Sequence, residues 1–216
     1  MQVTNLIEQF DRLQVIHGDK NLDAVYGAGQ INSPKLCLVF MNPTGKNISS
    51  NKEWKGLKAP WIGAKNVWKM LYQLDLFDED LFNQINEKKP EDWDYKFAEK
   101  VYREVIDNSL YITNLSKATQ VDARPLKNEV FKEYLTLFID EINSINPKVI
   151  ITFGNQVSSI LLDKSIKVSE YRKKHELVEI NERLVKVFPV YYPFGQGMRN
   201  IEKAKEDIDW IIKNQI

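Results

Sequence analysis

Short apolar runs alternate along the chain with longer stretches in which apolar residues recur every three or four positions. The short runs are rich in β-branched and aromatic residues and predict buried strands over residues 36–41, 110–114, 149–153 and 185–191. The longer stretches predict amphipathic helices over residues 6–16, 67–71, 97–106, 129–145, 156–162 and 201–212. Residues 177–180 and 184–191 flank a polar tripeptide, which suggests a hairpin.

Strands that alternate with helices, and that are apolar on both faces, are typical of a parallel sheet covered by helices. We therefore expect a three-layer α/β/α fold around a central, mainly parallel sheet of four strands. No repeat, low-complexity tract or linker interrupts the pattern, so we expect one domain over residues 1–216. Ligands bind such sheets outside the carboxyl ends of the strands, where the chain continues into loops at Asn42, Asn114 and Tyr192.

The charges are unevenly distributed along the chain, although the formal net charge is zero. Residues 43–74 contain six lysines and one glutamate, whereas residues 75–107 contain eleven acidic and five basic side chains. A basic loop on a neutral protein can contact phosphates. Charge alone favours the simpler interpretation of two solvated faces.

Several classes of chemistry lack the residues that they need. The single cysteine, Cys37, lies in an apolar run and cannot form an internal disulfide, a zinc knuckle or an iron–sulfur cluster. His17 and His175 have no metal-ligand spacing, and Lys46 is not part of a complete phosphate-binding loop. We therefore expect no metal and no cofactor.

Neither membrane insertion nor secretion is indicated. No run approaches the roughly 18 apolar residues of a membrane span, and the first residues do not resemble a signal peptide. We expect a cytoplasmic protein that does not bind membranes and is a monomer.

Five segments together resemble a known family. Residues 39–45, with the sequence Val-Phe-Met-Asn-Pro-Thr-Gly, look like a strand followed by the motif G-x-x-P-G. The tetrapeptide Pro60-Trp61-Ile62-Gly63 looks like P-F-x-G, and residues 110–114 look like a strand that closes on asparagine. Residues 147–162 and 187–193 look like two later motifs, of which the second usually ends in H-P-S. In this order, and from about residue 35 to 205, the segments resemble the uracil-DNA glycosylase superfamily.

The resemblance implies the α/β fold already expected and a DNA glycosylase of base-excision repair. Such a hydrolase removes uracil or another deaminated base, flipped out of DNA, by hydrolysing its N-glycosidic bond. It implies that Asn42 orients the attacking water and that backbone N–H groups, with Tyr192 or Gln196, stabilise the charge on the leaving base. The residues it places around the base are Met41, Trp61, Asn114 and Gln196.

The residue types suit these roles. Stacking of a base on an aromatic ring contributes about 1–3 kcal/mol, which Trp61 would supply, and the amide of Asn114 offers a donor and an acceptor to the edge of uracil. Basic residues near these motifs would contact DNA phosphates; they are Lys46, Lys52, Lys55, Lys58 and Arg199. Structural roles remain open as well: a turn at Asn42, an anchor at Trp61, a cap or turn at Asn114 and a packed aromatic at Tyr192.

Two departures from the family pattern define the main alternative. Tyr192 stands where the family usually has histidine, and Asn42 offers no carboxylate to take a proton from water. A non-catalytic protein that binds a nucleobase or nucleic acid on the same fold is therefore a second hypothesis. A nucleotide-handling hydrolase or transferase is a third, but the glycine-rich phosphate turn that it needs is missing from the sequence.

Overall fold

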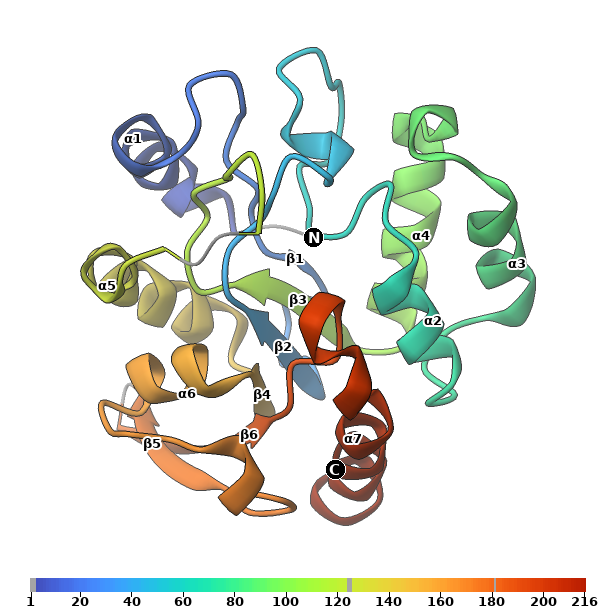
Figure 1. Cartoon of the computed structure of the whole chain (residues 1–216). Coiled ribbons are helices and arrows are strands. Elements are labelled where there is room, and N and C mark those ends of the chain that lie inside the picture. The colour runs from blue at the N-terminus through green and yellow to red at the C-terminus, as the bar shows by residue number, and fades with distance from the viewer. Residues whose placement is uncertain (1–2, 124–125, 181) are drawn as a thin grey trace.

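A mixed β-sheet with helices on both faces forms the centre of the structure (Figure 1). This computed structural model describes residues 3–123, 126–180 and 182–216. Within these residues the sheet has six strands in the order β1-β3-β2-β4-β6-β5. They are β1 (Ala28–Gly29), β2 (Leu36–Phe40), β3 (Leu110–Asn114), β4 (Val149–Phe153), β5 (Glu176–Ile180) and β6 (Arg183–Val190). The four central strands are parallel, and β1 and β5 are antiparallel edges.

The expected α/β class and parallel centre are confirmed, but the predicted number of strands is too low. The four predicted strands are the four central ones. The described part of the chain adds β5, the first arm of the suggested hairpin, and β1. Strand β1 has only two residues, too few to produce an apolar run that a sequence pattern could reveal.

Helices cover the sheet in two layers. Helices α2 (Asn66–Tyr72), α3 (Glu79–Glu87), α4 (Tyr95–Asp107) and α7 (Ile201–Gln215) lie on one face. Helices α5 (Asn128–Ile145) and α6 (Asn155–Leu161) lie on the other, and α1 (Ile7–His17) packs beside α5. No helix in the described ranges is long and apolar enough to cross a membrane.

The side chains of each central strand divide between the two layers because successive residues point to opposite faces. In β2, Leu36, Leu38 and Phe40 pack with the helices of the first layer, while Cys37 and Val39 pack with α5 and α6. All five residues are buried, so the run is apolar throughout. Burial also raises the pKa of the Cys37 thiol, which keeps it protonated.

The central strands should be the least tolerant part of the fold. We expect Ile151→Ala in β4, which removes a fully buried side chain, to lower the free energy of unfolding by about 2–5 kcal/mol. Leu177→Ala in β5 is the control, because Leu177 is 52% exposed and should change it by less than about 0.5 kcal/mol. Urea denaturation measures both, and equal effects would contradict this assignment of the core.

Candidate functional site

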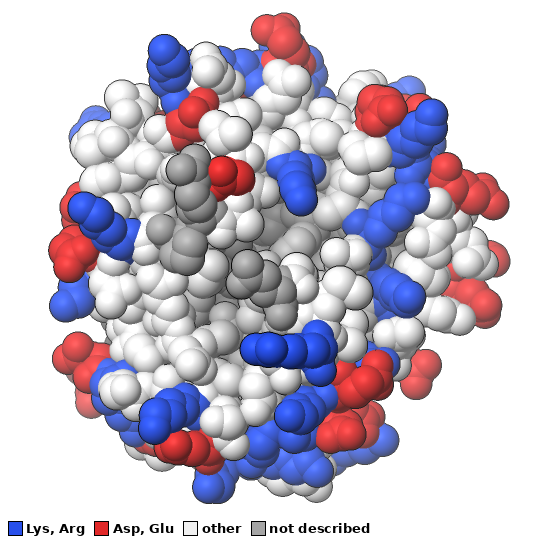
Figure 2. Space-filling model, viewed as in Figure 1, with Lys and Arg blue, Asp and Glu red and all other residues white. Residues whose placement is uncertain are grey.

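A cavity opens at the carboxyl ends of β2, β3 and β6. Figure 2 shows this face hollowed near its middle, with Lys and Arg side chains at several places around the hollow. Five residues predicted for catalysis or base binding line the cavity together, although they lie far apart in the sequence: Met41, Asn42, Trp61, Asn114 and Tyr192. The parallel strands explain this convergence, because their carboxyl ends meet at one edge of the sheet.

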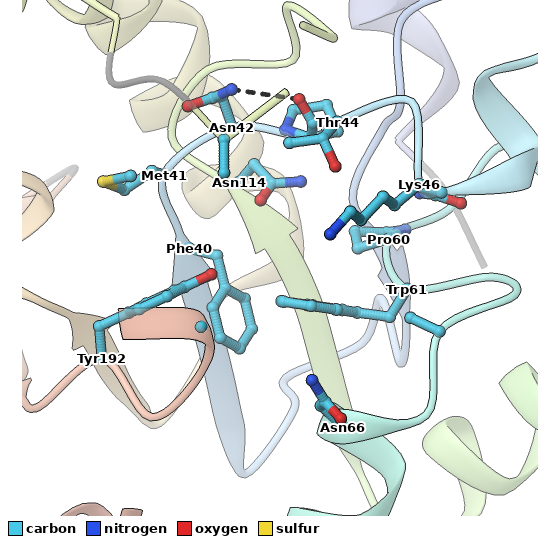
Figure 3. Close-up of a pocket in the computed structure, with 15 residues that line it drawn as sticks. Phe40, Met41, Asn42, Thr44, Lys46, Pro60, Trp61, Asn66, Asn114 and Tyr192 are labelled. Carbon is cyan, nitrogen blue, oxygen red and sulfur yellow. Dashed lines mark hydrogen bonds between the residues drawn. The ribbon is translucent and has the colours of Figure 1, made fainter. Parts of the chain in front are cut away.

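The side chain of Asn114 is buried but has no hydrogen-bond partner among the described residues. The residue closes β3 and is 3% exposed, and its carboxamide borders the cavity (Figure 3). The arrangement leaves the Nδ2 donor and the Oδ1 acceptor of the amide available to a ligand.

Trp61 is held in a strained conformation beside the cavity. Its φ angle of 66° lies in the left-handed region, which is uncommon for a residue with a large side chain. The indole N–H is buried without a hydrogen bond in the described structure. The ring packs edge-on against Phe40 and Phe194, with centroid distances of 5.0 and 4.9 Å. Strain of this kind collects at functional sites.

The loop that carries Trp61 is fixed through its backbone. The carbonyl groups of residues 59–61 each accept a hydrogen bond from a different part of the chain. Asn47 Nδ2 donates to the first at 2.7 Å, the Tyr102 hydroxyl to the second at 2.6 Å, and Trp68 Nε1 to the third at 3.2 Å. The position of the Trp61 ring is therefore set before any ligand binds.

Asn42 has one amide atom engaged and one available. Its Nδ2 donates to the carbonyl of Pro43 at 3.1 Å (Figure 3), and its Oδ1 makes no hydrogen bond within the described residues. The loop also pairs with the loop after β3, because Gln120 N donates to the Pro43 carbonyl at 3.1 Å and Gly45 N to the Gln120 carbonyl at 2.8 Å. The loops of Asn42 and Asn114 thus support each other.

Tyr192 extends from the loop after β6 toward Phe40 (Figure 3), with an interplanar angle of 81° between the two rings. Burial raises the pKa of its hydroxyl, so the group is a neutral hydrogen-bond donor at ordinary pH. A Cβ on Gly197 would lie 2.0 Å from the Tyr192 carbonyl oxygen, so this close turn requires glycine. Gln196 lies in the same turn, but its side chain is outside the described part of the structure.

The predicted DNA-binding residues lie in different surroundings. Lys46 lines the cavity, and its ammonium points into it without an ion pair among the described residues (Figure 3). Lys52 donates to the carbonyl of Lys20 at 2.7 Å, and Lys58 forms an ion pair with Asp23. Both border a second, neighbouring hollow. The remaining two, Lys55 and Arg199, are exposed and do not line the cavity.

Nine of the described lining residues were not predicted for the site, among them Phe40, Thr44 and Asn66. Phe40 is the last residue of a buried strand, and the sequence pattern assigns it only to the core. Asn66 is the first residue of α2. Its polar side chain at the start of a helix that follows a loop is the sequence feature that could have suggested it as a site residue. In Figure 3, Asn66 lies on the opposite side of the Trp61 ring from Asn114 and Lys46.

Comparison with families of known proteins identifies the family of the chain. The family model described as the Uracil DNA glycosylase superfamily matches residues 26–212, most of the chain. The matched range contains all five segments identified in the sequence and all the lining residues of the cavity. None of the curated proteins matches the chain.

The hydrogen bond from Tyr102 should be important for the loop of Trp61. We expect Tyr102→Phe to lower the free energy of unfolding by about 1–3 kcal/mol, because the buried carbonyl of Pro60 loses its donor. Tyr95→Phe is the matched control, since Tyr95 is 47% exposed. Urea denaturation compares the two, and an unchanged stability in Tyr102→Phe would show that the bond does not hold the loop.

Proposed function

Because the chain belongs to the uracil-DNA glycosylase superfamily, we propose that it is a DNA glycosylase that removes uracil or another deaminated base by hydrolysis. The observation that carries the proposal is the free carboxamide of Asn114 in the cavity that Trp61 also lines. A flipped-out base needs an aromatic surface and hydrogen-bonding groups in one pocket. Both are supplied here by residues whose backbones are fixed.

Base recognition follows from the two residues. Trp61 offers a ring for stacking, and Asn114 offers Oδ1 to an N–H of the base and Nδ2 to an adjacent carbonyl oxygen. Uracil carries this pair of groups at its imide edge. The cavity is formed largely by neutral groups, with Lys46 as its charged member among the described residues, which suits a neutral base.

Cleavage breaks the bond between the sugar carbon and the base nitrogen, and water then adds to that carbon. Asn42 would hold the water through Oδ1, the atom without a partner in the described residues. The Tyr192 hydroxyl would donate to an oxygen of the leaving base as negative charge develops there. No aspartate or glutamate in the described ranges lines the cavity, so the water loses its proton to solvent and the base anion takes one up from solvent. Excision is therefore slow.

The missing carboxylate also favours a second candidate function. A protein that binds an extruded base or a nucleic-acid end without cleavage needs Trp61 and Asn114 but no proton acceptor. The two functions share the pocket and differ only in the step at the sugar. Measurement of excision separates them.

Removal of the Asn114 amide should have a large effect on excision. With enzyme in excess of a uracil-containing oligonucleotide, we expect slow excision by the unmodified protein and a rate about 100- to 1000-fold lower for Asn114→Ala. Asn42→Ala should also lower the rate, because the water loses its acceptor. The control is Asn214→Ala, in the last turn of α7 and outside the cavity.

The outcomes distinguish the two candidates. A rate that survives both alanine changes would place the chemistry on other residues. No excision by the unmodified protein, combined with binding to the oligonucleotide that Asn114→Ala weakens, would favour the non-catalytic function.

Lys46 should contribute to DNA affinity through a phosphate. We expect Lys46→Gln to weaken oligonucleotide binding and to make the plot of log affinity against log salt less steep by about one. Lys148→Gln is the control, because Lys148 is exposed and directly precedes β4, at the amino end of that strand and not at the carboxyl ends that border the cavity. Fluorescence anisotropy at several salt concentrations measures both variants, and an unchanged slope for Lys46→Gln would exclude this contact.

A further inference from the structure

A charged pair is buried directly behind the candidate site. Lys117 follows β3 by three residues, and Glu141 lies on the face of α5 that packs against the sheet. Their side chains are 0% and 1% exposed, and Lys117 Nζ lies 2.5 Å from Glu141 Oε2. A lysine is almost never fully buried unless it is paired, so the burial of Lys117 has to be explained by what its ammonium group binds.

Every hydrogen of the ammonium group has a partner. Lys117 Nζ donates to Glu141 Oε2 at 2.5 Å, to Thr113 Oγ1 at 2.8 Å and to the backbone carbonyl of Asn114 at 2.5 Å. Glu141 Oε1 in turn accepts from the hydroxyl groups of Tyr111 at 2.8 Å and Thr113 at 2.9 Å. Burial lowers the pKa of Lys117, and the neighbouring carboxylate opposes that shift. The complete set of partners fits an ammonium and a carboxylate.

Stability alone is a weak reason to keep such a pair. Burial of two charges costs desolvation energy, and a well-packed apolar pair of similar volume is often at least as stable. Phe10 and Phe138 already flank the ammonium, with ring centroids 5.0 and 5.5 Å from Nζ, so an apolar pair would have apolar neighbours. What an apolar pair could not do is bind the carbonyl of Asn114.

That carbonyl belongs to the residue whose side chain is free in the cavity. The network fixes the backbone of Asn114 through its carbonyl group. The side-chain amide of the same residue makes no hydrogen bond to the described residues that would set its orientation. The same loop continues to Gln120, which hydrogen-bonds to the loop of Asn42. We propose that the Lys117–Glu141 pair positions the Asn114 carboxamide for base recognition. In its effect on excision, this role rests on the proposed glycosylase function.

The test replaces the whole network by apolar residues of similar shape. The variant Tyr111→Phe/Thr113→Val/Lys117→Met/Glu141→Leu leaves no buried charge or hydroxyl of the network behind. Glu141→Gln is a second variant, which keeps the side-chain shape if the full replacement does not fold. The control is Arg172→Met/Asp207→Leu, which removes the ion pair of Arg172 with the buried carboxylate of Asp207; neither residue lines the cavity.

The first measurement needs no substrate. The side-chain amide signals of Asn114 in a nitrogen–proton NMR spectrum are identified by their loss in Asn114→Ala. We expect them to shift or broaden in the network variants and to stay unchanged in the control variant. Unchanged signals in a folded network variant would overturn the proposal.

The second measurement is a double-mutant cycle on excision. We expect the network variant to lower the single-turnover rate by about 10- to 100-fold. Oligonucleotide affinity should fall by a smaller factor, because phosphate contacts supply most of it. In an Asn114→Ala background the same change should have almost no further effect, because the residue that it positions is already absent. If the two rate losses multiply in the combined variant, the Lys117–Glu141 pair acts through groups other than Asn114. If the unmodified protein excises nothing, the proposed function fails, and the NMR result still decides the positioning role.

Discussion

The parallel pairing of β2 with β3 is the constraint on which the site depends. It sets Phe40 opposite Asn114, so both strands end at the same level and their loops leave side by side. The pairing continues beyond the strands, since Leu115 N donates to the Phe40 carbonyl and Ser116 N to the Met41 carbonyl. A one-residue slip would turn every side chain of β3 to the other face of the sheet. Asn114 would then no longer lie beside the cavity.

The site combines satisfied backbone groups with unsatisfied side chains. Around Trp61 and Asn114 the carbonyl groups accept hydrogen bonds from Tyr102, Trp68 and Lys117, which fixes the backbone. The Asn114 carboxamide has no partner in the described structure and remains available to a ligand. Preorganised recognition requires this division, because groups whose backbone is already fixed lose less conformational entropy when a ligand binds. The strain at Trp61 is stored in the same arrangement.

The sequence predicted those features that depend on local pattern. The central strands were predictable because each is apolar on both faces, and Asn42, Asn114 and Tyr192 were predictable because polar loops follow these strands. The network of Lys117 was missed, because it depends on contacts between distant segments. One signal was present: Glu141 falls on the apolar stripe of α5, between Phe138 and the buried residues that follow it. Proximity in sequence to Trp61 also did not predict which lysines line the cavity. Lys46 lines it, whereas Lys52 and Lys58 border the second hollow.

The proposed chemistry of the pocket relies mainly on neutral groups, because Lys46 is the charged residue among its described lining. Asn42 can hold a water but takes its proton only weakly, and Tyr192 can donate a hydrogen bond but carries no charge at ordinary pH. Catalysis requires interactions that are stronger in the transition state than with the bound base. Stacking on Trp61 acts on both states, so by itself it gives affinity rather than rate. In the proposed function the rate therefore depends on the hydrogen bonds that strengthen as charge develops on the base, and the proposed donors are Asn114 Nδ2 and the Tyr192 hydroxyl.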